Sequence, residues 1–276
     1  MHGRIGFPLG TFVVALLAVD AKAAGDYSSS YSARDGGGGG LARPLNGGIV
    51  YPSLYGAIEQ NPSGLIHDNK TVLMLQWAPA MGSVTSSTVT EGLAYGNRAF
   101  GLGASASAAL DSGGVMRLSK AAVALGIGAP GFGFGVNTVY DSSAGGLDMD
   151  VGIGVENSSG IQISLLVTSV QAFRSTGAMN LGIGISKPQK YQIEGSWGFT
   201  ILSPLAQNVL RLVGVGYLGI VGLGVEASST SSTTTSSWAA GGSVLVQVTG
   251  RVGIGTRVLF DSVTRLGLTA SAQLAF

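Results

Sequence analysis

The stretch Leu-Gly-Leu-Thr-Ala-Ser-Ala-Gln-Leu-Ala-Phe, residues 266–276, ends the chain and alternates two kinds of side chain. Leu, Ala and Phe occupy every second position from Leu266 to Phe276, and Gly267, Thr269, Ser271 and Gln273 lie between them. A period of two over such a length indicates a β-strand with one apolar face, because a helix would repeat every 3.6 residues. The C-terminus therefore predicts a sheet protein.

The same alternation recurs upstream. In residues 147–156 the apolar side chains alternate with glycines and with Asp148, Asp150 and Glu156, which share one face. Lipid cannot accept that face, so we expect it to line a lumen. The pattern predicts about fourteen strands, at roughly 71–81, 87–95, 98–110, 118–129, 131–141, 146–156, 161–172, 178–186, 191–201, 208–217, 219–228, 238–249, 252–262 and 266–276. The weakest is 87–95, where Glu91 shares a face with Val89 and Leu93, so twelve strands is the alternative.

The composition favours a membrane protein. Charged residues make up only 11% of the chain, and 46 of the 276 residues are glycine. No segment after the N-terminal region has ~20 uninterrupted apolar residues, the length that a spanning helix needs. A closed barrel is the other structure that satisfies every backbone group in lipid. We therefore predict an all-β, transmembrane antiparallel barrel in the outer membrane of a Gram-negative bacterium, with outer-membrane lipid around it.

The N-terminus predicts export. His2 and Arg4 precede an apolar run from Phe12 to Val19, and Ala21-Lys22-Ala23 has the small-x-small pattern of a cleavage site, so residues 1–23 are expected to be a signal peptide. Its removal leaves equal numbers of basic and acidic residues, and a neutral chain argues against nucleic acid as a partner. The absence of cysteine excludes a lipid anchor on cysteine. Residues 24–70 lack a strand period, and 71–276 form the predicted barrel.

Two segments resemble known outer-membrane proteins. Asn61-Pro62-Ser63-Gly64-Leu65 is similar to the Asn-Pro-Ala-Gly-Leu segment before the first strand of FadL-type outer-membrane transporters of hydrophobic compounds, with Ser63 in place of Ala. The resemblance implies a fourteen-stranded barrel whose bore is closed by an N-terminal hatch, residues 24–70, with Asn61, Pro62, Gly64 and Leu65 as its motif. The final strand, ending in Phe276, resembles the signal that the outer-membrane assembly machinery recognises, which implies that machinery as a partner.

Polar and apolar positions both face the expected lumen. Its acidic wall consists of Asp148, Asp150, Glu156, Glu194 and Glu226, with Arg257 as counter-charge. A hydrated wall or a cation-selective path would both use these groups. They lie on several strands without the spacing of a calcium loop, so no metal site is predicted.

Two strands offer apolar groups to the lumen. In 208–217 both faces are apolar, and turning Arg211 inward is cheaper, since arginine facing lipid costs up to ~2–4 kcal/mol. This places Val213 and Val215 inside, and the strand 161–172 adds Leu166 and Val170. These four side chains are expected either to line a path for an apolar ligand or to pack against the N-terminal segment.

Catalysis is not predicted. After signal removal the only histidine is His67, and no serine has a recognisable nucleophile context. The pattern Gly126-x-Gly128-x-x-Gly131 lacks the helix that a dinucleotide site requires, so no cofactor is expected. The preferred hypothesis is a hatch-gated channel or transporter for small hydrophobic molecules. The alternatives are a non-specific polar porin and a structural or surface-display barrel without a transport role.

Overall fold

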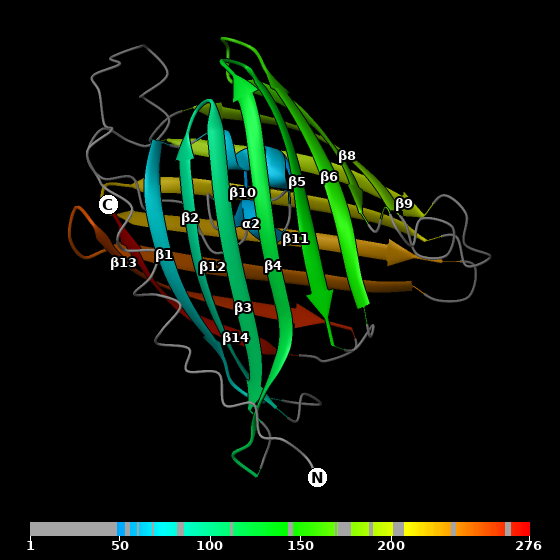
Figure 1. The fold of residues 1–276 in the computed structure, drawn as a ribbon, viewed down its shortest axis with the longest axis vertical. Coiled ribbons are helices and arrows are strands. Elements are labelled where there is room, and N and C mark those ends of the chain that lie inside the picture. Colours follow the sequence, from blue (N-terminus) through cyan, green and yellow to red (C-terminus); the bar gives the residue numbers. More distant parts are fainter. Residues whose placement is uncertain are drawn as a thin grey trace. The chain divides into compact units, whose positions relative to one another are not determined.

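The structure is a computed structural model that describes residues 49–52, 56–59, 61–67, 69–81, 86–110, 113–142, 146–168, 170, 178–187, 190–200, 207–232, 236–262 and 266–276. Its fourteen strands form one closed antiparallel barrel, in which each strand pairs with its neighbours in sequence and β1 pairs with β14 (Figure 1). The predicted fold class is confirmed, with fourteen strands and not twelve.

The strand bounds are close to the predicted ones. They are β1 Asn69–Ala78, β2 Ser87–Asn97, β3 Phe100–Leu110, β4 Met116–Ala129, β5 Phe132–Asp141, β6 Gly146–Glu156, β7 Ile161–Thr168, β8 Ala178–Lys187, β9 Tyr191–Thr200, β10 Asn208–Leu218, β11 Val221–Ser231, β12 Ser236–Gln247, β13 Val252–Asp261 and β14 Gly267–Ala275.

Most ends differ from the predicted ones by one to three residues, and the differences at β1 and β7 follow the pairing. β1 begins at Asn69 because Asn69 and Lys70 already pair with Asn97 and Gly96 of β2. β7 ends at Thr168, where its ladder with β8 ends, since Thr168 pairs with Ala178, the first residue of β8, while β6 continues alongside. Val170 therefore lies beyond the strand that was expected to hold it, although its backbone N–H still donates to the carbonyl of Met149 at 2.8 Å.

The barrel closes at the C-terminus. β1 and β14 pair from Val72 with Ala275 to Trp77 with Ala270. Beyond that ladder the Phe276 N–H donates to the Thr71 carbonyl at 2.9 Å, and the Thr71 N–H donates to the Phe276 carbonyl at 3.3 Å. These bonds satisfy the edge groups that an open sheet would leave unpaired.

The period of two separates a bulky outer face from a small inner face. On β8, Leu181, Ile183 and Ile185 are exposed, whereas Gly182, Gly184 and Ser186 between them are buried. The same division runs through β7, β9 and β10. β2 follows it with one exception, because Glu91 lies on the outer face beside Leu75 and Ala106 of its neighbours. Backbone pairing along the whole of β2 outweighs that single carboxylate.

Two short helices lie against the inner face. They are α2, Gly56–Glu59, and the 3₁₀ helix η2, Pro62–Ile66, and together they contact β2, β3, β4, β5 and β6 (Figure 1). We call the described residues from Ile49 to His67 the inner segment. Neither helix of the described chain has the length and hydropathy needed to cross a bilayer. The predicted signal peptide and residues 24–48 of the predicted hatch lie outside the described residues.

Candidate functional site

The inner segment is organised by Asn61. Its side-chain oxygen accepts hydrogen bonds from the Ser63 N–H at 3.2 Å and the Ser63 hydroxyl at 2.8 Å, and its amide nitrogen donates to the Ile49 carbonyl at 2.7 Å. Asparagine is a favoured helix N-cap, and Pro62 follows in the first helical position, where its missing N–H has no cost. The Asn-Pro-Ser-Gly-Leu sequence therefore forms η2, and the Asn61 side chain joins η2 to Ile49 at the start of the inner segment.

Glycines of the barrel wall allow this segment to approach the backbone. A Cβ added at Gly135 would lie 2.6 Å from the Ser63 nitrogen, and one at Gly133 would lie 2.8 Å from the Ser63 carbonyl. A Cβ at Gly101 would lie 2.8 Å from the Leu65 carbonyl. Real Cβ atoms are not found this close to backbone, so the glycines on the inner face of β3 and β5 make room for η2.

Two glycines of the Gly126-x-Gly128-x-x-Gly131 pattern also make room for the inner segment. A Cβ at Gly126 would lie 3.1 Å from the Pro62 carbonyl, and Gly128 packs beside Ile66. Gly131 has a φ of +80° in the turn between β4 and β5. The spacing thus arises from two inward-facing glycines and one turn glycine.

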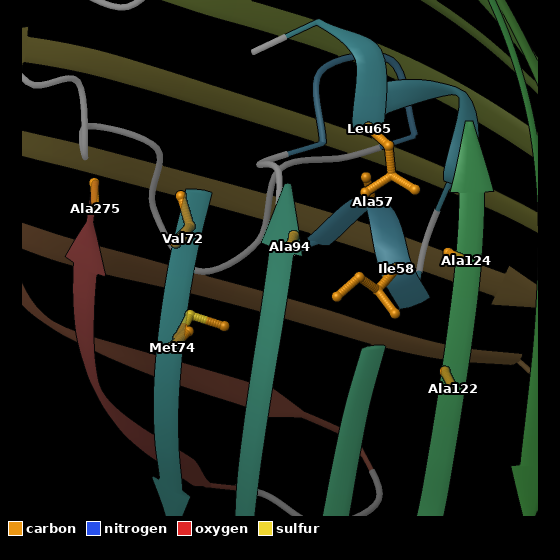
Figure 2. Packing of buried hydrophobic residues seen from close by; sticks show 9 residues of the cluster. All are labelled: Ala57, Ile58, Leu65, Val72, Met74, Ala94, Ala122, Ala124 and Ala275. Atoms are coloured by element: carbon orange, nitrogen blue, oxygen red, sulfur yellow. The ribbon is translucent and has the colours of Figure 1, made fainter. Parts of the chain in front are cut away.

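Apolar packing joins the segment to the wall near the closure of the barrel. Figure 2 shows Ala57, Ile58 and Leu65 of the segment beside inward side chains of β1, β2, β4 and β14, and these nine residues form one buried cluster. The wall residues are Val72, Met74, Ala94, Ala122, Ala124 and Ala275. Alanine recurs because a helix presses against this part of the wall, where larger side chains would not fit.

Polar contacts from Asn137 of β5 and Glu194 of β9 also hold the inner segment. Asn137, which is 1% exposed, donates from its amide to the Ile58 carbonyl at 2.9 Å and accepts from the Asp150 N–H at 3.0 Å. The Tyr51 N–H donates to the Glu194 carboxylate at 2.9 Å, and the Tyr51 hydroxyl donates to the Gly160 carbonyl at 2.6 Å. Charge-assisted bonds of the Tyr51–Glu194 kind are roughly twice as strong as neutral ones.

The four predicted apolar lumen residues divide into two groups. Leu166 is buried in a cluster with Ile49, Val50 and Tyr51, so it packs against the inner segment. Val213 and Val215, each 6% exposed, lie on the inner face of β10, beside Glu194 and Gln192 of β9. Val170, half-buried, is outside β7 and joins neither group.

The predicted polar residues also divide. Asp148, Asp150 and Glu156 lie along the inner face of β6, half-buried, and Glu194 is buried at the inner segment. Glu226 of β11 lies apart from them, between two guanidinium groups. Its oxygens accept from Arg257 Nε at 2.6 Å and from Arg211 Nη2 at 3.2 Å. Arg257 reaches it across β12, whose inward Gly241 and Ser243 leave the space open.

Charge therefore differs between the two sides of the inner wall. Carboxylates lie on β6 and β9, close to the inner segment, whereas the Arg211–Glu226–Arg257 cluster on β10, β11 and β13 has two positive groups for one negative group. The three side chains of that cluster are each partly solvent-accessible, at 23%, 11% and 21%. This arrangement can orient a charged solute, and with Asp261 of β13 the strands β10 to β13 hold two positive and two negative side chains.

Sequence reasoning did not single out Tyr51, Ile58 and Asn137 as site residues. Tyr51 and Ile58 lie in a segment without a period, so no pattern pointed to their contacts. Asn137 offered a weak signal, because it is an amide on a face otherwise made of glycines, Gly133 and Gly135. An amide there has a backbone group as its partner only because the inner segment lies against the wall.

Asn61 provides a direct test of this packing. Asn61→Ala would leave the Ile49 carbonyl and two Ser63 donors buried without their partner, and each such group costs about 1–3 kcal/mol. We expect thermal unfolding at a lower temperature and faster hydrogen exchange at Ser63 and Gly64. Asn157→Ala is the matched control, since Asn157 accepts from Ser159 and Ile161 N–H groups in an exposed turn. Equal effects of the two variants would contradict the role of Asn61.

Comparison with known proteins returns structural similarity alone. No protein-family model matches the sequence, and no curated protein matches it. A mutant of the Rh. blastica porin aligns with 75% of this chain and 98% of its own at 11% identity, with a TM-score of 0.47. A loop-deletion mutant of OmpT, an outer membrane protein of Vibrio cholerae, aligns with 76% and 98% at 10% identity, with a TM-score of 0.42. At these scores the fold assignment rests on the strand pairing of this chain itself.

Proposed function

We propose that this chain forms a channel for small molecules across the bacterial outer membrane, with its bore partly occupied by the inner segment. The observation behind the proposal is the combination of a closed fourteen-stranded barrel with an outer face of exposed large aliphatic side chains. Leu212 is 65% and Val225 67% exposed, and contiguous apolar surface of this kind on a soluble protein would drive association. Lipid accepts it, and closure leaves no backbone edge in the hydrocarbon.

The finer proposal is a gated transporter of hydrophobic compounds of the FadL type. Its support is that Asn61, Pro62, Gly64 and Leu65, the residues of the similar motif, are all buried and make the contacts that hold η2 against the wall. The inner segment adds no strand to the closed backbone ladder, so it can detach without breaking the barrel, which is what gating requires. We propose that residues 24–70 act as the hatch, with Asn69 and Lys70 joining it to β1, and that Phe276 directs assembly.

A second candidate is a polar porin, and one observation favours it. Arg211, Glu226 and Arg257 lie on the inner wall away from α2 and η2, whose contacts are with β2 to β6. A partly hydrated charged wall favours the passage of ions and sugars over that of hydrophobic compounds. Proteoliposomes separate the two candidates, because a polar porin would pass sugars at rates that fall with their size, whereas the gated transporter would exclude them.

Neither candidate includes catalysis. His67, the single histidine of the proposed mature chain, has its Nε2 3.5 Å from the side-chain nitrogen of Gln162. The proposal therefore assigns this histidine a place at the end of the inner segment and no chemical step.

The location is tested by fractionation. We expect the mature protein in the outer-membrane fraction, with β-rich circular dichroism in detergent and a faster-migrating band on unheated gels, because a closed barrel resists unfolding by detergent. Equal migration of heated and unheated samples would argue against a closed barrel in solution. Recovery as a soluble periplasmic monomer would overturn both the location and the channel proposal.

A further inference from the structure

The turns that follow β8 and β10 lie at the end of the barrel where β1 begins and β14 ends. Residues 188–190 connect β8 to β9, and residues 219–220 connect β10 to β11. Connections at the other end are longer in sequence, with 79–86 between β1 and β2 and 169–177 between β7 and β8. Outer-membrane barrels have short turns on the periplasmic side and longer loops outside. The two turns therefore belong to the periplasmic side of the membrane.

Two lysines delimit the turn between β8 and β9. Lys187 is the last residue of β8, Lys190 precedes β9, and the Lys190 N–H donates to the Lys187 carbonyl at 3.1 Å. A bond of this kind closes a β-turn, whose end Cα atoms lie within about 7 Å. Both side chains are exposed, and neither ammonium group has a hydrogen bond or ion pair within the part of the chain that the structure describes. Like charges this close repel each other, and a bound anion relieves that repulsion.

The short turns carry charge of one sign. Three of the six turns at this end contain a lysine or an arginine, and none contains an acidic residue; the turns are 98–99, 130–131, 157–160, 188–190, 219–220 and 248–251. On the neighbouring strands, Glu156 and Glu194 lie on the inner face, whereas Lys187 lies on the outer face with its partner Tyr191. An anion that approaches from the lipid side therefore meets cations first.

Lys187 lies at the edge of an apolar outer surface. Its partner Tyr191 is outward on β9, and Leu218 of β10 is 71% exposed. Leu218 lies beside the lysine turn, because the N–H of the preceding Tyr217 donates to the Lys190 carbonyl at 3.0 Å. Cations next to exposed aromatic and aliphatic side chains match the boundary between lipid headgroups and acyl chains.

A gap in the outer face leads away from the lysines. Gly214 and Gly216 face outward on β10, and Gly216 pairs with Tyr191 of β9 and Leu223 of β11. A Cβ added at Gly216 would meet no atom within 4 Å, so the space above this glycine is open. Leu218 closes the gap on the side of the turn. Hydrocarbon is the material that fills a gap with apolar walls on the lipid side of a barrel.

We propose that this surface binds an anionic phospholipid, with the headgroup phosphate on Lys187 and Lys190 and an acyl chain along Gly216 between Tyr191 and Leu223. The inference rests on the proposed outer-membrane location. Charge selects this occupant, because a zwitterionic headgroup brings a cation of its own towards the two ammonium groups. A second copy of the chain fits less well, since an isologous interface would bring a second pair of lysines to the same surface.

The test is native mass spectrometry of the purified full chain. The protein in detergent is incubated with equal amounts of phosphatidylglycerol and phosphatidylcholine that have the same acyl chains. We expect one phosphatidylglycerol per barrel to be retained, with a preference of roughly tenfold over phosphatidylcholine. Replacing both lysines, Lys187→Gln with Lys190→Gln, should remove most of that preference.

Single variants control for total charge. Lys187→Gln and Arg251→Gln each remove one exposed cation from the same end of the barrel, but Arg251 lies in the turn before β13. We expect Lys187→Gln to weaken the preference and Arg251→Gln to leave it unchanged. Equal losses in the two variants would mean that the net charge attracts the lipid, and would overturn the assigned site.

A further variant tests the apolar part. Gly216→Leu fills the gap, and because its added Cβ meets no atom within 4 Å the barrel should still form, as judged by gel migration. We expect weaker retention of both lipids, with the preference for phosphatidylglycerol unchanged because both lysines remain. Undiminished retention by this variant would contradict the placement of the acyl chain.

The remaining outcomes separate this inference from the proposed channel. Equal retention of the two lipids by the unmodified protein, or an unchanged preference after replacement of both lysines, would overturn the lipid site. A dimer that persists in phosphatidylglycerol and is lost in Gly216→Leu would assign the surface to a second copy instead. Conductance is measured separately in phosphatidylcholine bilayers. Conduction without lipid preference contradicts only the lipid site, and phosphatidylglycerol retention without conduction contradicts only the channel.

Discussion

A protein that lacks residues 26–67 will conduct ions several-fold better in a planar bilayer than the intact chain. The deletion stops before Asn69, because β1 begins there. It removes α2 and η2 from the inner face of β2 to β6 and exposes glycine, serine and alanine side chains instead. A barrel of fourteen strands has more interior volume than such small side chains can fill, so water should enter.

The enlarged bore should also prefer cations over anions. Removing Tyr51 frees the Glu194 carboxylate from its N–H partner, and Asp148 and Asp150 on β6 then face water. Carboxylates along a pore wall attract cations, so replacing both aspartates with asparagine should weaken the preference. It is measured as a reversal potential across a salt gradient. Equal conductance of the intact and shortened proteins would show that the inner segment does not obstruct the bore, and the polar porin would replace the gated transporter.

Gly135→Ala will displace the inner segment or destabilise the protein by about 1–3 kcal/mol, the usual cost of overpacking. The added Cβ would overlap the backbone of Pro62 and Ser63, which cannot move aside as a flexible side chain can. We expect a higher conductance than that of the unmodified protein, approaching that of the deletion. Combining it with Gly101→Ala, which meets the Leu65 backbone, should increase the effect.

Gly222→Ala is the matched control for this substitution. Gly222 also lies in a strand and faces inward, but its added Cβ would meet the Tyr217 ring at 3.6 Å and Leu245 Cβ at 3.9 Å, both ordinary contact distances. Both variants lose the same backbone freedom, so a difference between them reports the inner segment. If Gly135→Ala conducts and melts like Gly222→Ala, the close packing of η2 against β5 is absent in the membrane.

Most of the fold was predictable because the alternation that marks a strand is visible within its own residues. The outward Leu181, Ile183 and Ile185 alternate with the inward Gly182, Gly184 and Ser186 whether or not the rest of the chain is known. The same rule was weakest at Glu91, where one charge on the outer face obscured β2, although the strand pairs along its full length. Ends were less predictable, since β7 stops at the last pair of its ladder with β8, Thr168 with Ala178.

The candidate site was predictable only in part. Arg211 was expected to face inward from the cost of placing it in lipid, and Arg257 was expected to balance the acidic wall. Their shared partner Glu226 depends on β12, where Gly241 and Ser243 leave space for Arg257 to cross. Spacing along one strand holds no information about the strand two positions away.

The sequence by itself determined the strands, their two faces and the closed barrel, because alternation is a local property and each backbone group in lipid needs a partner. Only the tertiary structure explains why the inner face is so rich in glycine. Gly101 lies on β3 whereas Gly133 and Gly135 lie on β5, and only folding brings all three against the backbone of residues 62–65. The contact joins residues far apart in the sequence, and one partner is a segment without a repeating pattern. The glycines are needed because a packed backbone leaves no room for a Cβ, and that packing exists only in the folded protein.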